Sequence, residues 1–269
     1  MVKDYVKPRS LDEAFEALAM PGSIALAGGT FALIGEVHGT KADIERAVDI
    51  GGLLSEAVER RGSELYVGAG CSFQALAEAP AAPACLRAAA LTMANRNTRN
   101  RATVGGNLGA NKSCASLVPI LLALGAQAEY KLRDSGPRHI ALEQWLAAPQ
   151  GLVLSLSIPI VSGTRAASGR ASRTSCDLAT ATVGLAFRLE GNAVRDLRVA
   201  LGGFGPHAML FPAITALFEG KSLPPKADIE KAVEPLLSAL SDKRGGADYK
   251  KRRGAVLVAD ALHAAEVLA

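Results

Sequence analysis

The chain has 269 residues, of which 49% are hydrophobic and 21% are charged, a composition typical of a globular protein with a substantial core. At roughly 150 residues per domain, this length predicts two domains. The formal net charge of +4 does not indicate nucleic-acid binding, because the basic run Lys250 to Arg253 has only Tyr249 beside it and fits a solvated helix face better.

Helices and strands are expected to alternate along the first 160 residues. Residues 10–18 predict a capped helix, because Ser10 can accept from the first turn and Glu13 follows three positions later. Short apolar or β-rich runs that end at glycines predict strands, and capped or alanine-rich runs predict helices. The expected strands are 24–30, 47–50, 64–70, 126–132 and 151–160, and the expected helices are 72–79, 83–95, 117–124 and 141–147.

The second half of the chain begins with residues 161–177, which are rich in Gly, Ser and Arg and are the strongest linker candidate. Two β-rich runs follow, 178–191 and 193–205, and the dipeptide Gly191-Asn192 between them favours a hairpin. The last sixty residues read as helices. This order predicts an α+β chain with a domain boundary near residues 160–170.

The four cysteines indicate reduced thiols in a cytoplasmic protein, since no Cys-x-x-Cys pair occurs that would favour zinc or an iron–sulfur cluster in this chain. They are Cys71, Cys85, Cys114 and Cys176. The first residues are polar, and no run reaches the roughly 18 apolar residues of a membrane helix. We therefore expect neither a secretory signal nor a membrane span.

Familiar catalytic motifs are missing from the sequence. There is no Gly-x-Gly-x-x-Gly fingerprint, no P-loop and no Gly-x-Ser-x-Gly elbow. The histidines are scattered at His38, His139, His207 and His263. A chain without an evident acid, base or nucleophile is typical of a protein whose cofactor carries the chemistry.

Two glycine pairs are the strongest functional signal. Residues 26–33 read LAGGTFAL and residues 102–108 read ATVGGNL, and each pair stands beside a threonine, Thr30 or Thr103. Glycine admits positive φ and close approach of a ligand, and successive N–H groups can bind an anion. Tight turns alone also explain such loops. Because two occur, a phosphate or pyrophosphate ligand is favoured, with the apolar run 117–124 anchoring the second loop.

These segments resemble the two FAD-binding segments of the flavoprotein subunit of the molybdenum hydroxylases, the family of xanthine dehydrogenase and carbon monoxide dehydrogenase. The resemblance rests on ALAGGTFAL (25–33) and ATVGGNLGANKSCASLVPILLALGA (102–126). It continues in GLVLSLSIPI, RVALGGFGPHAM and YKKRRGAVLVADAL, so it spans nearly the whole chain.

The resemblance implies an FAD-binding domain of the vanillyl-alcohol oxidase (PCMH) type at residues 1–162, with two α+β subdomains at about 1–55 and 56–162. A smaller C-terminal domain, 168–269, would hold a three-stranded antiparallel sheet and helices. By the same resemblance, backbone N–H groups and hydroxyls of two loops would wrap the FAD pyrophosphate. These residues are Ala27, Gly28, Gly29, Thr30 and Phe31 in the first loop and Thr103, Val104, Gly105, Gly106 and Asn107 in the second.

Further positions are assigned to the flavin by the resemblance. Val153 would lie near the pyrimidine edge of the isoalloxazine, and Arg170 falls where the family has a lysine close to the ring. The alternative for Arg170 is a solvated linker charge. Ser116 replaces the family's aspartate on the ribose side, residues 149–151 lack the usual glutamate, and Met93 stands at the place of an aromatic residue.

The resemblance implies an oxidoreductase subunit that transfers electrons through FAD. A molybdopterin-binding large subunit and a small subunit with [2Fe–2S] clusters would be separate chains, and the final acceptor would be NAD, oxygen or a quinone. Two alternatives remain open at this point: a self-contained flavin oxidoreductase, or a scaffold subunit of such a complex that has lost FAD.

Overall fold

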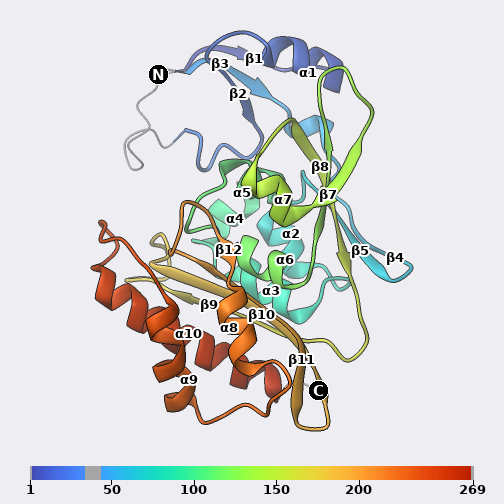
Figure 1. Cartoon of the computed structure of the whole chain (residues 1–269). Coiled ribbons are helices and arrows are strands. Elements are labelled where there is room, and N and C mark those ends of the chain that lie inside the picture. Colours follow the sequence, from blue (N-terminus) through green and yellow to red (C-terminus); the bar gives the residue numbers. More distant parts are fainter. Residues whose placement is uncertain (1, 34–43, 268–269) are drawn as a thin grey trace.

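The computed structural model describes residues 2–33 and 44–267 (Figure 1). His38 lies outside the described residues. Within these ranges the chain forms three sheets, each with its own hydrophobic core, and together they confirm the expected α+β class. None of the described helices is long and apolar enough to cross a membrane.

The N-terminal subdomain is a small parallel sheet with one helix, at the top of Figure 1. Its elements are β1 (Val2–Val6), α1 (Leu11–Leu18), β2 (Ser23–Leu26) and β3 (Ile44–Asp49), with strand order β1-β3-β2. The predicted cap of α1 is confirmed, because Ser10 Oγ accepts from the N–H of Glu13 at 3.1 Å. Ala14, Val48 and Ile50 form the core.

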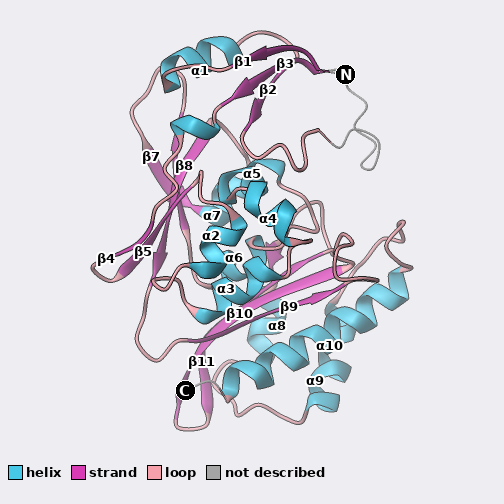
Figure 2. Ribbon diagram, turned by 180° about the vertical axis from the view of Figure 1, so that it is seen from behind, coloured by secondary structure: helices cyan, strands magenta, loops and turns pink. Residues whose placement is uncertain are grey.

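The second subdomain is a five-stranded antiparallel sheet with helices packed beside it (Figures 1 and 2). Its strand order is β4-β5-β8-β6-β7. The strands are β4 (Val58–Arg61), β5 (Glu64–Gly68), β6 (Gln127–Lys131), β7 (Arg138–Ala141) and β8 (Leu152–Pro159). The helices are η1 (Gly51–Leu53), α2 (Phe73–Glu78), α3 (Ala84–Leu91), α4 (Arg96–Arg101), α5 (Val104–Ala110), α6 (Val118–Ala123) and α7 (Leu142–Ala147).

The C-terminal domain is an antiparallel sheet of order β12-β11-β10-β9, with helices on its outer face in both views. The predicted hairpin is confirmed, with Gly191 at φ +59° between its strands. Three long strands agree with the expected sheet, and a two-residue edge strand is added. The elements are β9 (Arg165–Ala171), β10 (Ala181–Glu190), β11 (Ala193–Gly202), β12 (Met209–Leu210), α8 (Pro212–Phe218), α9 (Lys226–Val233), η2 (Glu234–Leu236) and α10 (Ala247–Glu266).

Two sequence interpretations are corrected by this domain. The linker candidate 161–177 contains β9, whose small residues pair with β10 and bury Ala167 and Ala171. The polar composition of β9 did not indicate a strand, because its pairing with β10 is what fixes it. The domain start expected at 168 falls inside this strand. The basic run is also not a solvated face throughout, because Lys250 is only 1% exposed.

Helix α6 explains the apolar run that follows the second glycine pair. All of its residues are buried, and it lies between the second subdomain and the C-terminal sheet. Its backbone touches that sheet so closely that a Cβ on Gly184 would lie 2.2 Å from the N atom of Ile120. A helix that is apolar on every side is stable only where protein covers it all round. The run therefore ties the second loop to both domains.

Candidate cofactor site

A cavity of about 870 Å³ opens between the two subdomains and the C-terminal domain. Its volume is within the roughly 300–1,000 Å³ usual for ligand and cofactor sites. Its walls come from the turn after β2, the segment around α4 and α5, the start of β8, and β9 with the segment that follows. Segments distant in the sequence thus meet at one place.

All of the site residues expected from the sequence line this cavity except Val104. Residues 27–31 come from the turn after β2, and Thr103 stands at the N-cap of α5. Ser116 precedes α6, Val153 lies on β8, and Arg170 lies on β9. Val104 is 1% exposed and packs in the core, so it supports the loop from behind.

The second glycine loop is the first turn of a helix, which the sequence did not reveal. The N–H groups of Val104 to Asn107 already have acceptors inside the chain, so the expected wrapping by these four donors needs correction. Val104 N donates to Cys71 O at 2.9 Å and Gly105 N to Ala69 O at 2.8 Å. Gly106 N and Asn107 N donate to Thr103, at 3.0 Å in each case.

The first turn of α5 offers the side-chain amide of Asn107 to a ligand. Its side-chain oxygen is buried and has no hydrogen-bond partner among the described residues. A buried polar atom without a partner costs about 1–3 kcal/mol, so such an atom in a cavity wall favours a ligand that supplies the missing bond.

The first glycine loop has open donors. Within the described part of the chain, the N–H groups of Gly28, Gly29 and Thr30 donate to no acceptor. Gly29 adopts the left-handed conformation, φ +71°, which permits successive N–H groups to point to one side. Lys112, which the sequence analysis missed, lines the same wall with its Nζ 5.3 Å from the centroid of the Phe31 ring. This wall suits an anionic group such as a pyrophosphate.

The glycines of the two pairs have different tasks. A Cβ on Gly28 would lie 1.8 Å from Arg101 O, and one on Gly105 would lie 2.8 Å from the Ala69 Cβ. Both therefore allow backbone segments to touch. Gly106 is helical and not at positive φ, and a Cβ there would meet only Thr103 Oγ1 within 4 Å.

Arg170 is not the solvated linker charge of the alternative interpretation. Its Nη1 donates to Ser175 O at 2.8 Å and its Nη2 donates to Asp177 O. Its Nε is buried without a partner among the described residues. Burial lowers the pKa of the guanidinium from its ordinary value, but arginine stays charged in proteins. The site thus holds an oriented cation with an unused donor.

The turn before α4 forms another part of the cavity wall, in which the sequence pointed to Met93 but not to Ala94 or to the role of Arg99. Ala94 has φ +40°, a strained value for a residue with a side chain. Arg99 holds it by donating from Nη1 to Met93 O at 3.0 Å and to Ala94 O at 3.1 Å. Met93 and Ala94 both line the cavity.

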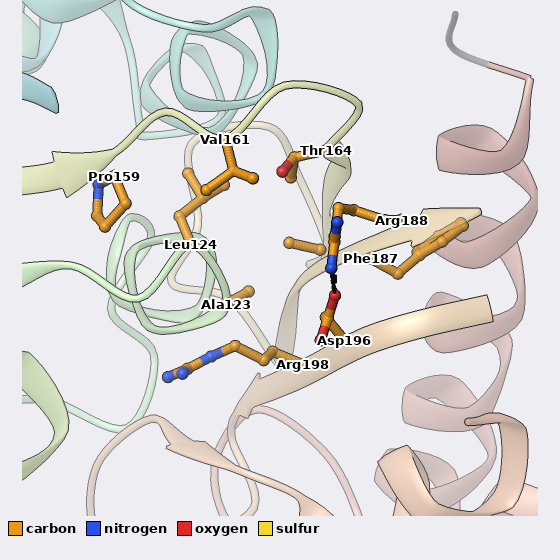
Figure 3. A pocket seen from close by; sticks show the side chains of 10 residues that line it. Ala123, Leu124, Pro159, Val161, Thr164, Phe187, Arg188, Asp196 and Arg198 are labelled. Atoms are coloured by element: carbon orange, nitrogen blue, oxygen red, sulfur yellow. Dashed lines mark hydrogen bonds and ion pairs between the residues drawn. The ribbon is translucent and has the colours of Figure 1, made fainter. Parts of the chain in front are cut away.

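A second cavity of about 380 Å³ lies at the junction of α6, the β8–β9 connection and the C-terminal sheet (Figure 3). Two of its charges are already paired, since Arg188 and Asp196 point toward each other and form an ion pair. Arg198 donates from Nε to Leu122 O at 3.2 Å. None of the expected site residues lines it, so the larger cavity is the candidate cofactor site.

In the parts of the chain that the structure describes, no group of three or more His, Cys, Asp or Glu side chains could hold a metal ion. The residues of the larger cavity fit a dinucleotide cofactor instead. It combines open backbone donors, an unpartnered amide oxygen and a half-buried cation within one cavity.

Comparison with known families and proteins gives two domain matches. Residues 1–160 match the FAD binding domain in molybdopterin dehydrogenase. Residues 167–265 match the CO dehydrogenase flavoprotein C-terminal domain.

Individual proteins are similar over almost their full length. The carbon monoxide dehydrogenase medium chain of Hydrogenophaga pseudoflava is 28% identical over 280 residues, which cover 97% of this chain and 96% of that protein. The uncharacterized protein YgfM of Escherichia coli K12 is 27% identical over 263 residues, covering 97% and 95%. A solved carbon monoxide dehydrogenase from Hydrogenophaga pseudoflava superposes with a TM-score of 0.89 at 25% identity, covering 99% of this chain and 98% of the other.

Proposed function

The chain belongs to the family of FAD-binding medium subunits of molybdenum hydroxylases, and from this premise we propose that it takes up electrons from the metal centres of two partner chains and passes them through FAD to a final acceptor. One partner would be a large subunit that binds molybdopterin and oxidises the substrate. The other would be a small subunit with [2Fe–2S] clusters. The final acceptor would be NAD, oxygen or a quinone, and the complex would work in the cytoplasm.

The observation that carries this proposal is the 870 Å³ cavity, in which both glycine loops and Arg170 meet. Two conventional explanations of the glycine pairs, tight turns and core packing, account for Gly28 and Gly105 but not for the open donors and the unpartnered Asn107 oxygen. A ligand with an anionic centre and polar edges accounts for both.

We assign roles to the cavity residues on this basis. The N–H groups of Gly28, Gly29 and Thr30 would hold the pyrophosphate, with Ala27 and Phe31 fixing the turn. Asn107 and the Thr103 hydroxyl would bind from the second loop, in which Val104, Gly105 and Gly106 keep the backbone close. Ser116 would contact the ribose side, and Val153 the pyrimidine edge through its backbone.

Bound FAD supplies the redox chemistry, since it accepts and releases electrons that no side chain of this site can carry. Arg170 would place a fixed positive charge beside the ring. A cation there stabilises negative charge on the reduced flavin and thereby favours reduction. With the start of the second domain moved from 168 back to the beginning of β9, the domain limits 1–162 and 165–269 would then divide the chain into a part that encloses the cofactor and a part that supplies this cation, because β9 belongs to the C-terminal sheet.

The proposal is tested by purifying the chain from its native host under mild conditions. We expect the flavin's visible absorption and two co-purifying chains, one with molybdenum and one with iron. Colourless protein that FAD cannot reconstitute would support the scaffold alternative. A chain that purifies alone, coloured and fully active on a substrate would support the self-contained oxidoreductase.

A further inference from the structure

An ion pair between the buried Lys250 of α10 and the exposed Asp242, in the segment before that helix, lies beside the cofactor cavity. Lys250 is 1% exposed, and its Nζ lies 2.8 Å from Asp242 Oδ2. The same Nζ donates to Leu240 O at 2.8 Å. A lysine charge is buried only where a counter-charge and hydrogen bonds satisfy it, so this residue fixes the segment 240–242 onto the start of α10.

Asp242 in turn holds Arg244. The carboxylate accepts from the Arg244 backbone N at 2.8 Å, from its Nε at 3.0 Å and from its Nη2 at 2.5 Å. A guanidinium gripped at two of its nitrogens has a fixed direction, which a single surface ion pair does not provide. Lys250 and Asp242 therefore orient Arg244.

Arg244 reaches the wall of the cofactor cavity. Its Nη1 donates to Ala179 O at 3.4 Å, and its own carbonyl accepts from Thr180 Oγ1 at 3.1 Å. Ala179 lines the cavity, as does Cys114. The wall segment before Ala179 includes Asp177, the carbonyl of which accepts from Arg170.

We infer that Lys250, Asp242 and Arg244 form a positioning relay, which fixes the wall 176–180 and Arg170 against the FAD. This inference rests on the proposed function of the cavity and adds positioning residues that lie outside it. Lys250 acts through Asp242, and Asp242 acts through Arg244. Arg244 adds a second guanidinium near the wall that already holds Arg170, so its loss should affect the reduced flavin more than the oxidised one.

The decisive variant is Arg244→Met, which leaves the ion pair of the buried Lys250 with Asp242 intact and so spares the fold. In the full chain, we expect FAD to bind about tenfold more weakly, measured by fluorescence titration of the apoprotein. The flavin midpoint potential should fall, by about 30 mV for each tenfold by which binding of the reduced form is weakened over the oxidised form. A merely structural contact would not move the potential.

Three further variants complete the test. Lys250→Met should weaken FAD binding in the same direction, whereas Lys250→Arg, which keeps a buried cation with donors, should stay within about threefold of the parent. The matched control is Lys226→Met, which breaks an exposed ion pair between Lys226 of α9 and Asp260 of α10, the helix that carries Lys250. It should leave both affinity and potential unchanged.

The outcomes distinguish a failure of the relay from a failure of the proposed function. If Arg244→Met binds FAD as the parent does and with the same potential, the relay is refuted while the cofactor site stands. If the parent chain itself does not take up FAD, the proposed function fails first. If Lys250→Met fails to fold, the relay is tested by two single variants, Arg244→Met and Thr180→Val. The second removes the hydroxyl that is bonded to Arg244 O.

Discussion

Gly28→Ala gives the sharpest test of how the cavity is built. A Cβ at this position would lie 1.8 Å from Arg101 O and 3.2 Å from Ala102 Cα. Carbon contacts are comfortable only near 3.5 Å, so the turn after β2 and the residues before Thr103 must move apart by roughly 1.5 Å or more. Both obstacles are backbone, and no rotamer change relieves them.

The cost should be at the upper end of overpacking, about 3 kcal/mol, which lowers the melting temperature by roughly 6–12 °C for a domain of this size. Displacing the N–H groups of the first loop removes hydrogen bonds to an anion. Each is worth about 1.5–3 kcal/mol, so FAD affinity should fall about 10- to 100-fold.

Thermal melting and fluorescence titration with FAD measure the two effects. Gly52→Ala is the matched control, because a Cβ there meets nothing within 4 Å. It should change stability by no more than about 0.5 kcal/mol and leave FAD binding intact. If Gly28→Ala melts and binds FAD like the control, the two glycine loops are not pressed together in solution and the reasoning is wrong.

Other variants probe the remaining parts of the site. Gly106→Ala should lose most of its flavin, measured as FAD per chain, while its free energy of unfolding falls by no more than about 1 kcal/mol. The reason is that the new Cβ disturbs only the Thr103 cap and otherwise enters the cavity, and full flavin content would contradict this placement. Arg170→Gln should fold but lower the flavin midpoint potential, and an unchanged potential would show that the cation lies away from the ring. Ser116→Asp should bind FAD equally or more tightly, since a carboxylate makes a stronger hydrogen bond than a hydroxyl, and clear weakening would place Ser116 elsewhere. For Asp242, burial raises the pKa of the carboxyl, but the hydrogen bonds from Arg244 and Lys250 outweigh it and lower the pKa well below its usual range. Its stabilisation is therefore present above the unfolded pKa of about 3.9 and lost as the pH falls below that value, so the parent's melting temperature should drop more steeply below about pH 4 than that of Asp242→Asn. Parallel curves for the two proteins would contradict this.

The elements that the sequence predicted are those decided by local interactions. Ser10 and Ser72 cap α1 and α2 through their own hydroxyls, and the glycine of the dipeptide Gly191-Asn192 turns the hairpin. The strand β8 carries enough apolar residues to be recognised alone. In each case the signal lies within a few residues and is visible in a single sequence.

The elements that were missed depend on distant partners. β9 is built of small and polar residues, and only its pairing with β10 makes it a strand. Helix α5 contains two consecutive glycines, which disfavour a helix by about 1 kcal/mol each. It forms because Thr103 caps it and because Cys71 O and Ala69 O accept from its first N–H groups. Likewise, nothing near Lys250 in the sequence shows that Asp242 folds back onto it.

Sequence patterns and the family resemblance identified the cavity residues, but they did not show that the two glycine loops have different roles. The sequence suggested two equivalent loops, whereas the first keeps the N–H groups of Gly28, Gly29 and Thr30 open and the second has used those of residues 104–107 to build α5. Gly28 lies against the carbonyl of Arg101, two residues before the Thr103 cap, so the second turn sets the position of the first. Substitutions around Arg101 and Thr103 should therefore weaken FAD binding even where the side chain does not touch the cofactor, because they displace the donors of Gly28, Gly29 and Thr30.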